Sequence, residues 1–245
     1  TQQLSATGLG LTELRSDSTD ISYADTKVCR VDLILDLENS NCDDYSFGPL
    51  AKRILLVGDS AAGSISDAVA SFAKSNEFNF SVYYANSCPV TARAYKYREN
   101  CESNFAQISE YIEKLNPDFL VIANMSDLYV SESGLGKVIV DFDGNPARSA
   151  DEALQLWIAG LQSRIENRFS LRKVLIVQQP PLSAMRESIL LQKLFDEEVS
   201  LDNSDTRNMI VQAEAELFKS YKNIAVFDPA SVLCDDKNCR QTLNG

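Results

Sequence analysis

Short apolar runs recur along the chain from residue 51, and a stretch with helical spacing follows each of the first four. Five of these runs predict strands: Arg53–Val57, Phe80–Ala85, Phe119–Ala123, Val174–Gln178 and Ile224–Phe227. Each run is nearly continuous and lacks a regular polar alternation. Such a pattern is typical of strands that are covered on both faces, as strands of parallel sheets are.

Between these runs, apolar residues recur every three or four positions, which is the spacing of one buried helix face. The spacing predicts helices over about 63–74, from after Ser103 up to Pro117, over about 150–169 and over about 206–221. Strands that alternate with helices form parallel sheets through right-handed crossovers. We therefore expect an α/β fold, a three-layer α/β/α sandwich around a five-stranded parallel sheet.

Other segments carry weaker signals. Residues 1–50 are polar and lack a strong period, so we expect an extension that packs on a domain formed by residues 51–245. The pair Asp143-Gly144 favours a small hairpin within 138–146. Residues 183–204 are interpreted as a helical or irregular insertion. Trp157 lies on the apolar face of its predicted helix and is expected in the core.

Composition narrows the possible partners. The 245 residues carry a formal net charge of −12, which disfavours nucleic acid and anionic membrane surfaces. No apolar run is long enough to predict a membrane-spanning helix, and residues 1–28 lack the apolar core of a signal peptide. We interpret the sequence as a fragment of a longer product.

Six cysteines indicate the compartment. They are Cys29, Cys42, Cys88, Cys101, Cys234 and Cys239. Sequence alone does not choose among their possible pairings, and three sequential pairs are the simplest choice. A metal site is disfavoured, because the chain has neither a Cys-x-x-Cys motif nor a histidine. Free buried cysteines are the alternative to disulfides, and disulfides imply an exported protein.

The first strand ends at Gly58-Asp59-Ser60, directly before a helix. Gly58 is interpreted as the residue that permits a tight turn. Ser60 then lies at the carboxyl end of a strand, where ligands bind in open parallel sheets, with its backbone N–H directed at a substrate oxyanion. The alternative is that Asp59 or Ser60 only caps the helix. Gln178-Gln179-Pro180-Pro181 follows the fourth strand at the same edge and either lines a pocket or simply ends the strand.

Further segments accompany this turn. A cysteine pair precedes it, Asn86-Ser87-Cys88-Pro89 follows the second strand, and Phe227-Asp228-Pro229 precedes Leu233-Cys234. Over about residues 25–245 this arrangement resembles the SGNH (GDSL-like) hydrolase family, specifically the extracytoplasmic SGNH domain of acyltransferase-3 membrane O-acyltransferases. The resemblance and the spacing together favour the disulfides Cys29–Cys42, Cys88–Cys101 and Cys234–Cys239.

The resemblance implies roles for three positions. Ser60 matches the nucleophile, and its own N–H is one oxyanion donor. A second donor is expected from the loop after strand two, at Asn86–Ser87, with Ser87 as the candidate position. Asn124, which follows strand three, is the candidate for a side-chain donor. The alternative for Asn124 is a structural role as a loop-capping amide.

The base that the family uses has no counterpart here. Family members carry an Asp-x-x-His motif after the last cysteine pair, whereas this chain contains no histidine. Asp235 and Asp236 are expected only to shape the turn between Cys234 and Cys239. Either the motif lies outside the 245 residues or the protein lacks it. Without a base, a serine is a poor nucleophile, so the chain as given is expected to be nearly inactive.

The resemblance implies an O-acyltransferase (acetyltransferase) that acts on hydroxyls of a bacterial cell-envelope glycan or glycolipid through a Ser60 acyl-enzyme. A membrane acyltransferase-3 domain of the same polypeptide is expected to deliver the acyl group, without a cofactor or metal. The domain is expected outside the cytoplasm, tethered to the membrane by a region outside this chain. A stand-alone secreted carbohydrate esterase and a non-catalytic envelope-binding module are the alternatives.

Overall fold

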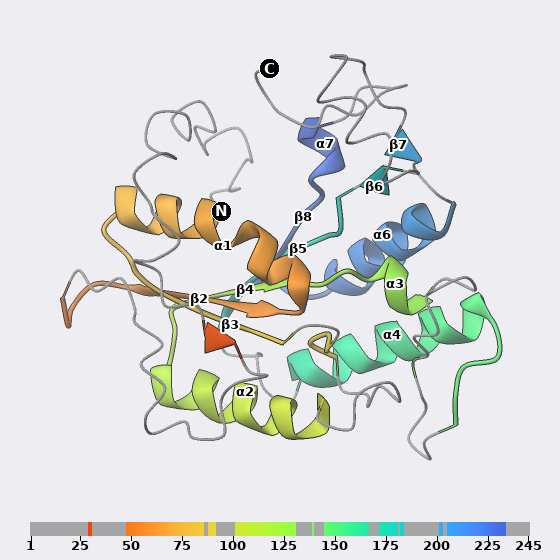
Figure 1. Cartoon of the computed structure of the whole chain (residues 1–245), viewed down its shortest axis with the longest axis horizontal. Helices are drawn as coiled ribbons and strands as arrows, with labels where there is room; N and C mark the ends of the chain where they lie inside the picture. Colours follow the sequence, from red (N-terminus) through yellow and green to blue (C-terminus); the bar gives the residue numbers. More distant parts are fainter. Residues whose placement is uncertain are drawn as a thin grey trace.

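The structure is a computed structural model that describes residues 29–30, 48–85, 88–91, 101–130, 139, 145–166, 172–180, 182–183, 201–202 and 205–233. Its centre is a six-stranded sheet of order β1-β3-β2-β4-β5-β8, in which every neighbouring pair is parallel (Figure 1). The strands are β1 (Cys29–Arg30), β2 (Arg53–Gly58), β3 (Asn79–Tyr84), β4 (Phe119–Ala123), β5 (Lys173–Val177) and β8 (Ile224–Phe227). The five predicted strands are therefore confirmed to within one residue at each end.

The helices are α1 (Ser60–Ser75), α2 (Cys101–Leu115), α3 (Asp127–Val130), α4 (Ala150–Arg164), α6 (Asp205–Phe218) and α7 (Ala230–Leu233). In Figure 1, α1 lies on one side of the sheet and α2 and α4 lie on the other. The two clusters of buried side chains agree with this view: one joins α1 to the sheet, and the other joins α2, α4 and α6 to it. The predicted three-layer α/β/α fold is confirmed.

Strand β2 shows why the apolar runs lack polar alternation. Ile54 and Leu56 belong to the cluster on the α1 side, whereas Leu55 and Val57 belong to the opposite cluster. All four are buried, because successive side chains of a strand point to opposite faces and both faces are covered. A continuous apolar run is therefore the expected sequence of a central strand in this fold.

Strand β1 extends the sheet beyond the five predicted strands. Cys29 and Arg30 pair in parallel with Tyr83 and Tyr84 of β3, at the edge of the sheet. Two residues are too few to show a period in sequence. The domain boundary expected at residue 50 stays a prediction, although residues 29–30 already belong to the sheet.

The expected insertion at 183–204 begins and ends in a small sheet. Strand β6 (Leu182–Ser183) pairs antiparallel with β7 (Leu201–Asp202). Residues 184–200 and the hairpin expected at Asp143-Gly144 lie outside the described residues.

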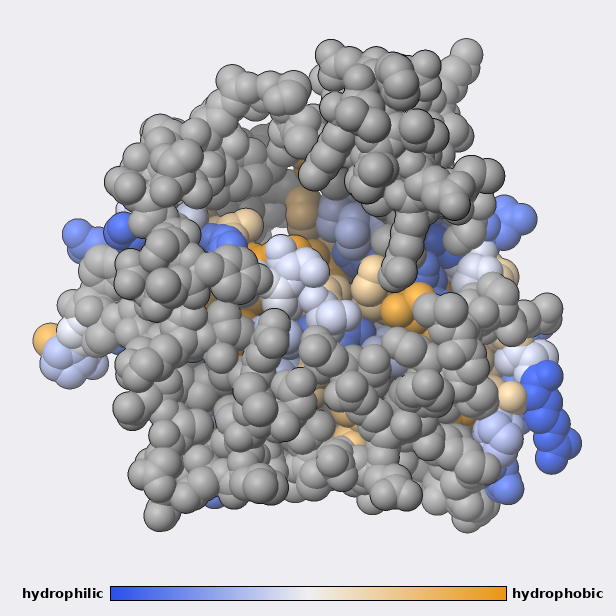
Figure 2. Space-filling view, in the orientation of Figure 1, coloured by the Kyte–Doolittle hydropathy of each residue, from blue (hydrophilic) through white to orange (hydrophobic). Residues whose placement is uncertain are grey.

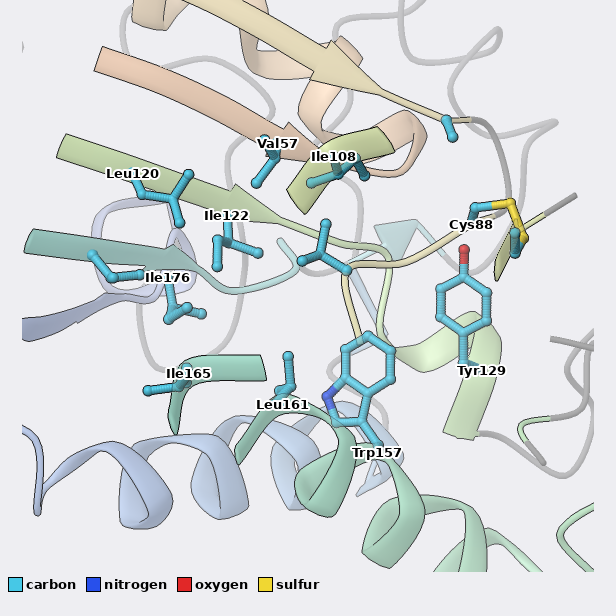
Figure 3. Packing of buried hydrophobic residues seen from close by; sticks show 14 of the residues in the cluster. Val57, Cys88, Ile108, Leu120, Ile122, Tyr129, Trp157, Leu161, Ile165 and Ile176 are labelled. Atoms are coloured by element: carbon cyan, nitrogen blue, oxygen red, sulfur yellow. A yellow bond between two sulfur atoms is a disulfide. The ribbon is translucent and has the colours of Figure 1, made fainter. Parts of the chain in front are cut away.

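Trp157 of α4 is fully buried, as predicted. Its ring stacks on Tyr129 of α3 with centroids 5.7 Å apart, and Figure 3 shows the two rings side by side. Its Nε1 donates a hydrogen bond of 2.9 Å to Oε1 of Glu214 on α6. The core under the carboxyl ends of the strands thus combines aromatic packing with a buried carboxyl group.

In the part of the chain that the structure describes, none of the helices has the length and apolarity to span a bilayer.

Candidate active site

Ser60 is the first residue of α1, two residues after the end of β2, and is half-buried. Asp59 precedes it in an extended conformation, and its Oδ1 accepts a 2.8 Å hydrogen bond from the N–H of Ala61. Asp59 is therefore the helix cap, as the alternative interpretation predicted. The cap also sets Ser60 at the strand-to-helix turn, as predicted, whereas the roles of Ser60 as nucleophile and oxyanion donor stay a proposal. In Figure 2, residues of intermediate hydropathy lie beside more hydrophobic ones at the centre of the face on which α1 begins.

The side chain of Asp59 joins two loops at the carboxyl edge of the sheet. Its Oδ2 accepts hydrogen bonds from the backbone N–H of Met125 (2.9 Å) and from the hydroxyl of Tyr129 (2.8 Å). Asp59 is completely buried. A buried carboxyl group is tolerated because donors surround its oxygens. The turn that carries Ser60 is thus held by the loop after β4.

Gly58 is needed for a different reason from the one the sequence suggested. Its φ is not positive, so the turn itself does not require the conformational freedom of glycine. Gly58 is paired with Ala123 of β4, and a Cβ at Gly58 would lie 1.8 Å from the carbonyl oxygen of Ala123. Only glycine permits this close approach of the two strands directly before the turn.

Asn124 follows β4 at the same edge and is 7% exposed. Its Oδ1 accepts a 2.9 Å hydrogen bond from the N–H of Val90, in the loop after β3. The alternative interpretation, an amide that fixes a loop, is thereby met. Because Oδ1 faces Val90, the amide presents its donor, Nδ2, in another direction. The role of Asn124 as an oxyanion donor stays a proposal.

The loops after β2, β3 and β4 therefore meet, as expected for parallel strands. Asn86 and Ser87 lie outside the described residues. The predicted disulfide Cys88–Cys101 is confirmed and links this edge to the start of α2. The pairings Cys29–Cys42 and Cys234–Cys239 stay predictions, because their side chains lie outside the described part of the chain.

A family model described as SGNH domain (fused to AT3 domains) matches residues 28–245. The chain belongs to this family. Membership supports the predicted acyltransferase function, since AT3 denotes the acyltransferase-3 domain. No curated protein sequence gives a significant match.

Solved structures are similar to this SGNH domain in fold. One is the periplasmic domain of a lipopolysaccharide acetyltransferase from Salmonella ser. Paratyphi A, with a TM-score of 0.60 and 11% identity over 89% of this chain and 80% of that chain. Another is a carbohydrate acetylesterase family member from Sinorhizobium meliloti, with a TM-score of 0.45 and 18% identity over 75% of this chain and 85% of that chain. At these identities the first likeness shows the fold alone.

The β5 side of the SGNH domain's carboxyl edge contains polar residues that are buried. Gln178 donates from Nε2 to the carbonyl oxygen of Val211 (3.0 Å) and to Oε2 of Glu214 (3.1 Å). Gln179 accepts through Oε1 from the N–H of Asp127 (2.9 Å). Both glutamines are almost fully buried, so in this structure they belong to the interior: Gln178 holds α6, and Gln179 holds the start of α3. The hypothesis that they line a pocket gains no support from these contacts.

Two carboxyl groups in this region have shifted pKa values. Burial raises the pKa of Asp127. The hydrogen bond with the Gln179 side chain, and to a lesser extent the positive charge of Arg207, oppose this upward shift. Burial also raises the pKa of Glu214, and the hydrogen bonds from Trp157 and Gln178 oppose this shift. Neither group was singled out from the sequence.

A signal for the charged residues of α6 does exist in the sequence. Arg207, Ile210, Glu214 and Phe218 are spaced by three or four positions and all four are buried. The two charged residues therefore lie on the apolar stripe of the helix, which is where charged side chains are rare unless they are paired.

Among the described residues, no group of three or more histidine, cysteine, aspartate or glutamate side chains is arranged to hold a metal ion.

Proposed function

We propose that this SGNH domain is the O-acyltransferase domain of a bacterial envelope enzyme, and that it transfers an acetyl or short acyl group to a hydroxyl of a glycan or glycolipid. The observation that carries the proposal is the position of Ser60, the first residue of α1, at a turn held by the buried Asp59. Two comparisons support it: the family is fused to AT3 domains, and a structure with the same fold is a lipopolysaccharide acetyltransferase domain.

In the proposed reaction, Oγ of Ser60 attacks the carbonyl carbon of the acyl donor and its proton passes to a base. The tetrahedral intermediate collapses to a Ser60 ester, and the leaving group takes a proton from the conjugate acid of the base. The acceptor hydroxyl then attacks this ester, its proton passes to the base, and Ser60 Oγ is released and reprotonated. The backbone N–H of Ser60, Nδ2 of Asn124 and a donor at Ser87 are the proposed oxyanion donors.

We propose that a histidine base and its aspartate partner come from sequence outside the 245 residues, which contain no histidine. Ser60 alone has a pKa far above neutrality and needs such a base to react. The 245-residue chain by itself is therefore expected to hydrolyse a simple acetyl ester barely above background.

The proposal places the domain outside the cytoplasm, with the acyl group supplied by an AT3 domain of the same polypeptide. The disulfide Cys88–Cys101 supports this compartment, because disulfides persist in oxidising surroundings. The similar Salmonella domain is periplasmic by its description. A membrane tether outside this chain is part of the proposal.

The test uses the full-length natural protein with Ser60→Ala, and with Ser75→Ala as the control. Ser75 is the exposed last residue of the same helix. We expect Ser60→Ala to lower acyl transfer by on the order of 10³-fold or more, with a Ser60-linked acyl group detected by mass spectrometry only where Ser60 is present. Unchanged transfer in Ser60→Ala would reject serine catalysis and favour the binding module. Loss of the acyl group to water alone, whatever glycan is added, would favour the secreted esterase.

A further inference from the structure

Arg207 occupies a position that is unfavourable for an arginine. It lies in the first turn of α6, where the positive end of the helix dipole repels a positive charge. It is also 3% exposed. Taking a guanidinium group out of water is unfavourable unless charged and polar partners compensate for the lost hydration. Both the helix dipole and the burial disfavour an arginine here, and such exceptions are typical of functional sites. The partners of Arg207 therefore need to be considered.

The partners of Arg207 come from the ends of two strands. Its Nε donates a 2.9 Å hydrogen bond to the backbone carbonyl oxygen of Gln179, two residues after β5. Another guanidinium nitrogen forms an ion pair with Oδ1 of Asp228, the residue directly after β8. Its charge also opposes the burial-raised pKa values of Asp127 and Glu214. Arg207 thus lies between the β4, β5 and β8 ends of the carboxyl edge.

Asp228 also binds the segment that follows β8. The same Oδ1 accepts a 2.9 Å hydrogen bond from the N–H of Ala230, the first residue of α7. The carbonyl oxygen of Asp228 accepts from the hydroxyl of Ser231 at 2.6 Å. The ion pair with Arg207 therefore fixes the direction in which the chain leaves β8.

A series of contacts also leads from Arg207 to the Ser60 turn. The side chain of Gln179, whose carbonyl binds Arg207, accepts from the N–H of Asp127 at the start of α3. The same short helix carries Tyr129, whose hydroxyl binds Asp59. One buried side chain therefore connects the exit of β8 with the residue next to the proposed nucleophile.

We propose that Arg207 is a positioning residue for acyl transfer at Ser60. It holds the β5 and β8 ends of the carboxyl edge in register with the β2 and β4 ends, through the contacts of Gln179 with Asp127 and of Tyr129 with Asp59 beside Ser60. This inference rests on the proposed function. It assigns no contact between Arg207 and the substrate.

The test compares Arg207→Met with Arg172→Met in the full-length natural protein, together with Arg207→Lys and Asp228→Asn. Arg172 is a half-buried arginine directly before β5, at the opposite edge of the sheet, and one of its nitrogens donates to the carbonyl oxygen of Ile112 at 3.4 Å. Each methionine variant removes a guanidinium group and leaves a backbone carbonyl oxygen without that donor, so both are expected to lower the melting temperature.

We expect Arg207→Met to lower kcat by about 10- to 100-fold with KM for the acyl acceptor nearly unchanged, because a shift of about 1 Å between reacting groups costs that much. Arg207→Lys keeps the charge near Asp228 and should recover part of the rate, whereas Arg172→Met should keep the wild-type kcat. Asp228→Asn keeps an oxygen that accepts from Ala230 but removes the ion pair, so it should also lower kcat. This variant replaces Arg207→Met in the test if Arg207→Met does not fold.

The inference is overturned if the Arg207 and Asp228 variants that fold keep the wild-type kcat. It is overturned equally if Arg172→Met, at the same loss of melting temperature, lowers kcat as much as they do, since lost stability would then explain every variant. Ser60→Ala in the same assay separates the two failures. If Ser60→Ala abolishes transfer while the Arg207 variants do not lower it, only the positioning role fails. If Ser60→Ala leaves transfer unchanged, the proposed function fails as well.

Discussion

The hydroxyl of Tyr129 donates a 2.8 Å hydrogen bond to Oδ2 of Asp59, the residue that caps α1 and precedes Ser60. The Tyr129 ring stacks on Trp157, with 8° between the ring planes (Figure 3). Because both aromatic residues are buried, packing in the α3–α4 core fixes where the hydroxyl points. The geometry of the candidate nucleophile turn thus depends on a side chain 70 residues away in the sequence.

Tyr129→Phe tests this dependence. The substitution keeps the ring stack but removes one donor to a fully buried carboxyl group, so we expect a loss of about 1–3 kcal/mol in the free energy of unfolding. Tyr221→Phe is the matched control, since the Tyr221 hydroxyl binds Glu166 at 2.9 Å on the surface. The control should change stability by less than about 0.5 kcal/mol. Urea denaturation of the two variants measures the difference, and equal losses would contradict the role given to Tyr129.

Gly58→Ala and Gly63→Ala test two close approaches around the same turn. A Cβ at Gly58 would lie 1.8 Å from a backbone oxygen of β4, which cannot move without disturbing the sheet. A Cβ at Gly63 would lie 2.8 Å from the ring of Tyr84, which is a side chain and is able to shift. We expect Gly58→Ala to lose more than about 4 kcal/mol or to fail to fold, and Gly63→Ala to lose clearly less. Soluble yield and urea midpoints decide, and the reverse order would contradict the explanation.

The strands were predictable because the signal that defines them is local. A buried parallel strand is apolar at nearly every position, so Ile54 to Val57 identify β2 without knowledge of its neighbours. Helix ends are less local: α1 begins at Ser60, ahead of the predicted Gly63, because Asp59 caps it. Sequence correctly marked Ser60 and Asn124 as residues at strand ends.

The contacts that hold the site were not predictable in the same way. Glu214 and Arg207 are charged residues on a helix, and such residues are exposed in most proteins. Their burial depends on Trp157, which is 57 residues from Glu214, and on Asp228, which is 21 residues from Arg207. No local period encodes those pairs. The close approach of β4 that excludes a side chain at position 58 was not predictable either, because it is a tertiary contact.

Removal of the Cys88–Cys101 disulfide should affect both stability and the candidate site. The bond closes a loop with a sequence separation of 13, so Cys88→Ala with Cys101→Ala should lose about 2–4 kcal/mol. The same loop carries Val90, whose N–H orients the amide of Asn124. In the full-length protein we therefore expect kcat for acyl transfer to fall together with stability, and to fall further than in a variant of equal melting temperature altered far from the edge, such as Arg172→Met. Equal kcat in the two variants would contradict the link to Asn124.

The last prediction concerns pH and the buried carboxyl group of Glu214. Burial raises its pKa above the ordinary value of 4.5, so the folded protein retains this proton to higher pH than the unfolded chain does. The contribution of Glu214 to stability is then fully present below about pH 4.5 and is lost as the pH rises through the folded-state pKa. The side chain in Glu214→Gln does not titrate. In the wild type, the two carboxyl oxygens accept hydrogen bonds from Trp157 and Gln178, and the substitution replaces one of these acceptors with an NH2 donor.

We therefore expect Glu214→Gln to be less stable than the wild type by about 1–3 kcal/mol near pH 4.5, and the difference to shrink as the pH rises toward 8. Glu216→Gln is the control, because Glu216 is exposed on the same helix and pairs with the exposed Lys219. Its difference from the wild type should stay small over the whole range. Urea denaturation at several pH values measures both differences, and a difference for Glu214→Gln that grows with pH would show that the buried carboxyl group is stabilised in its charged form.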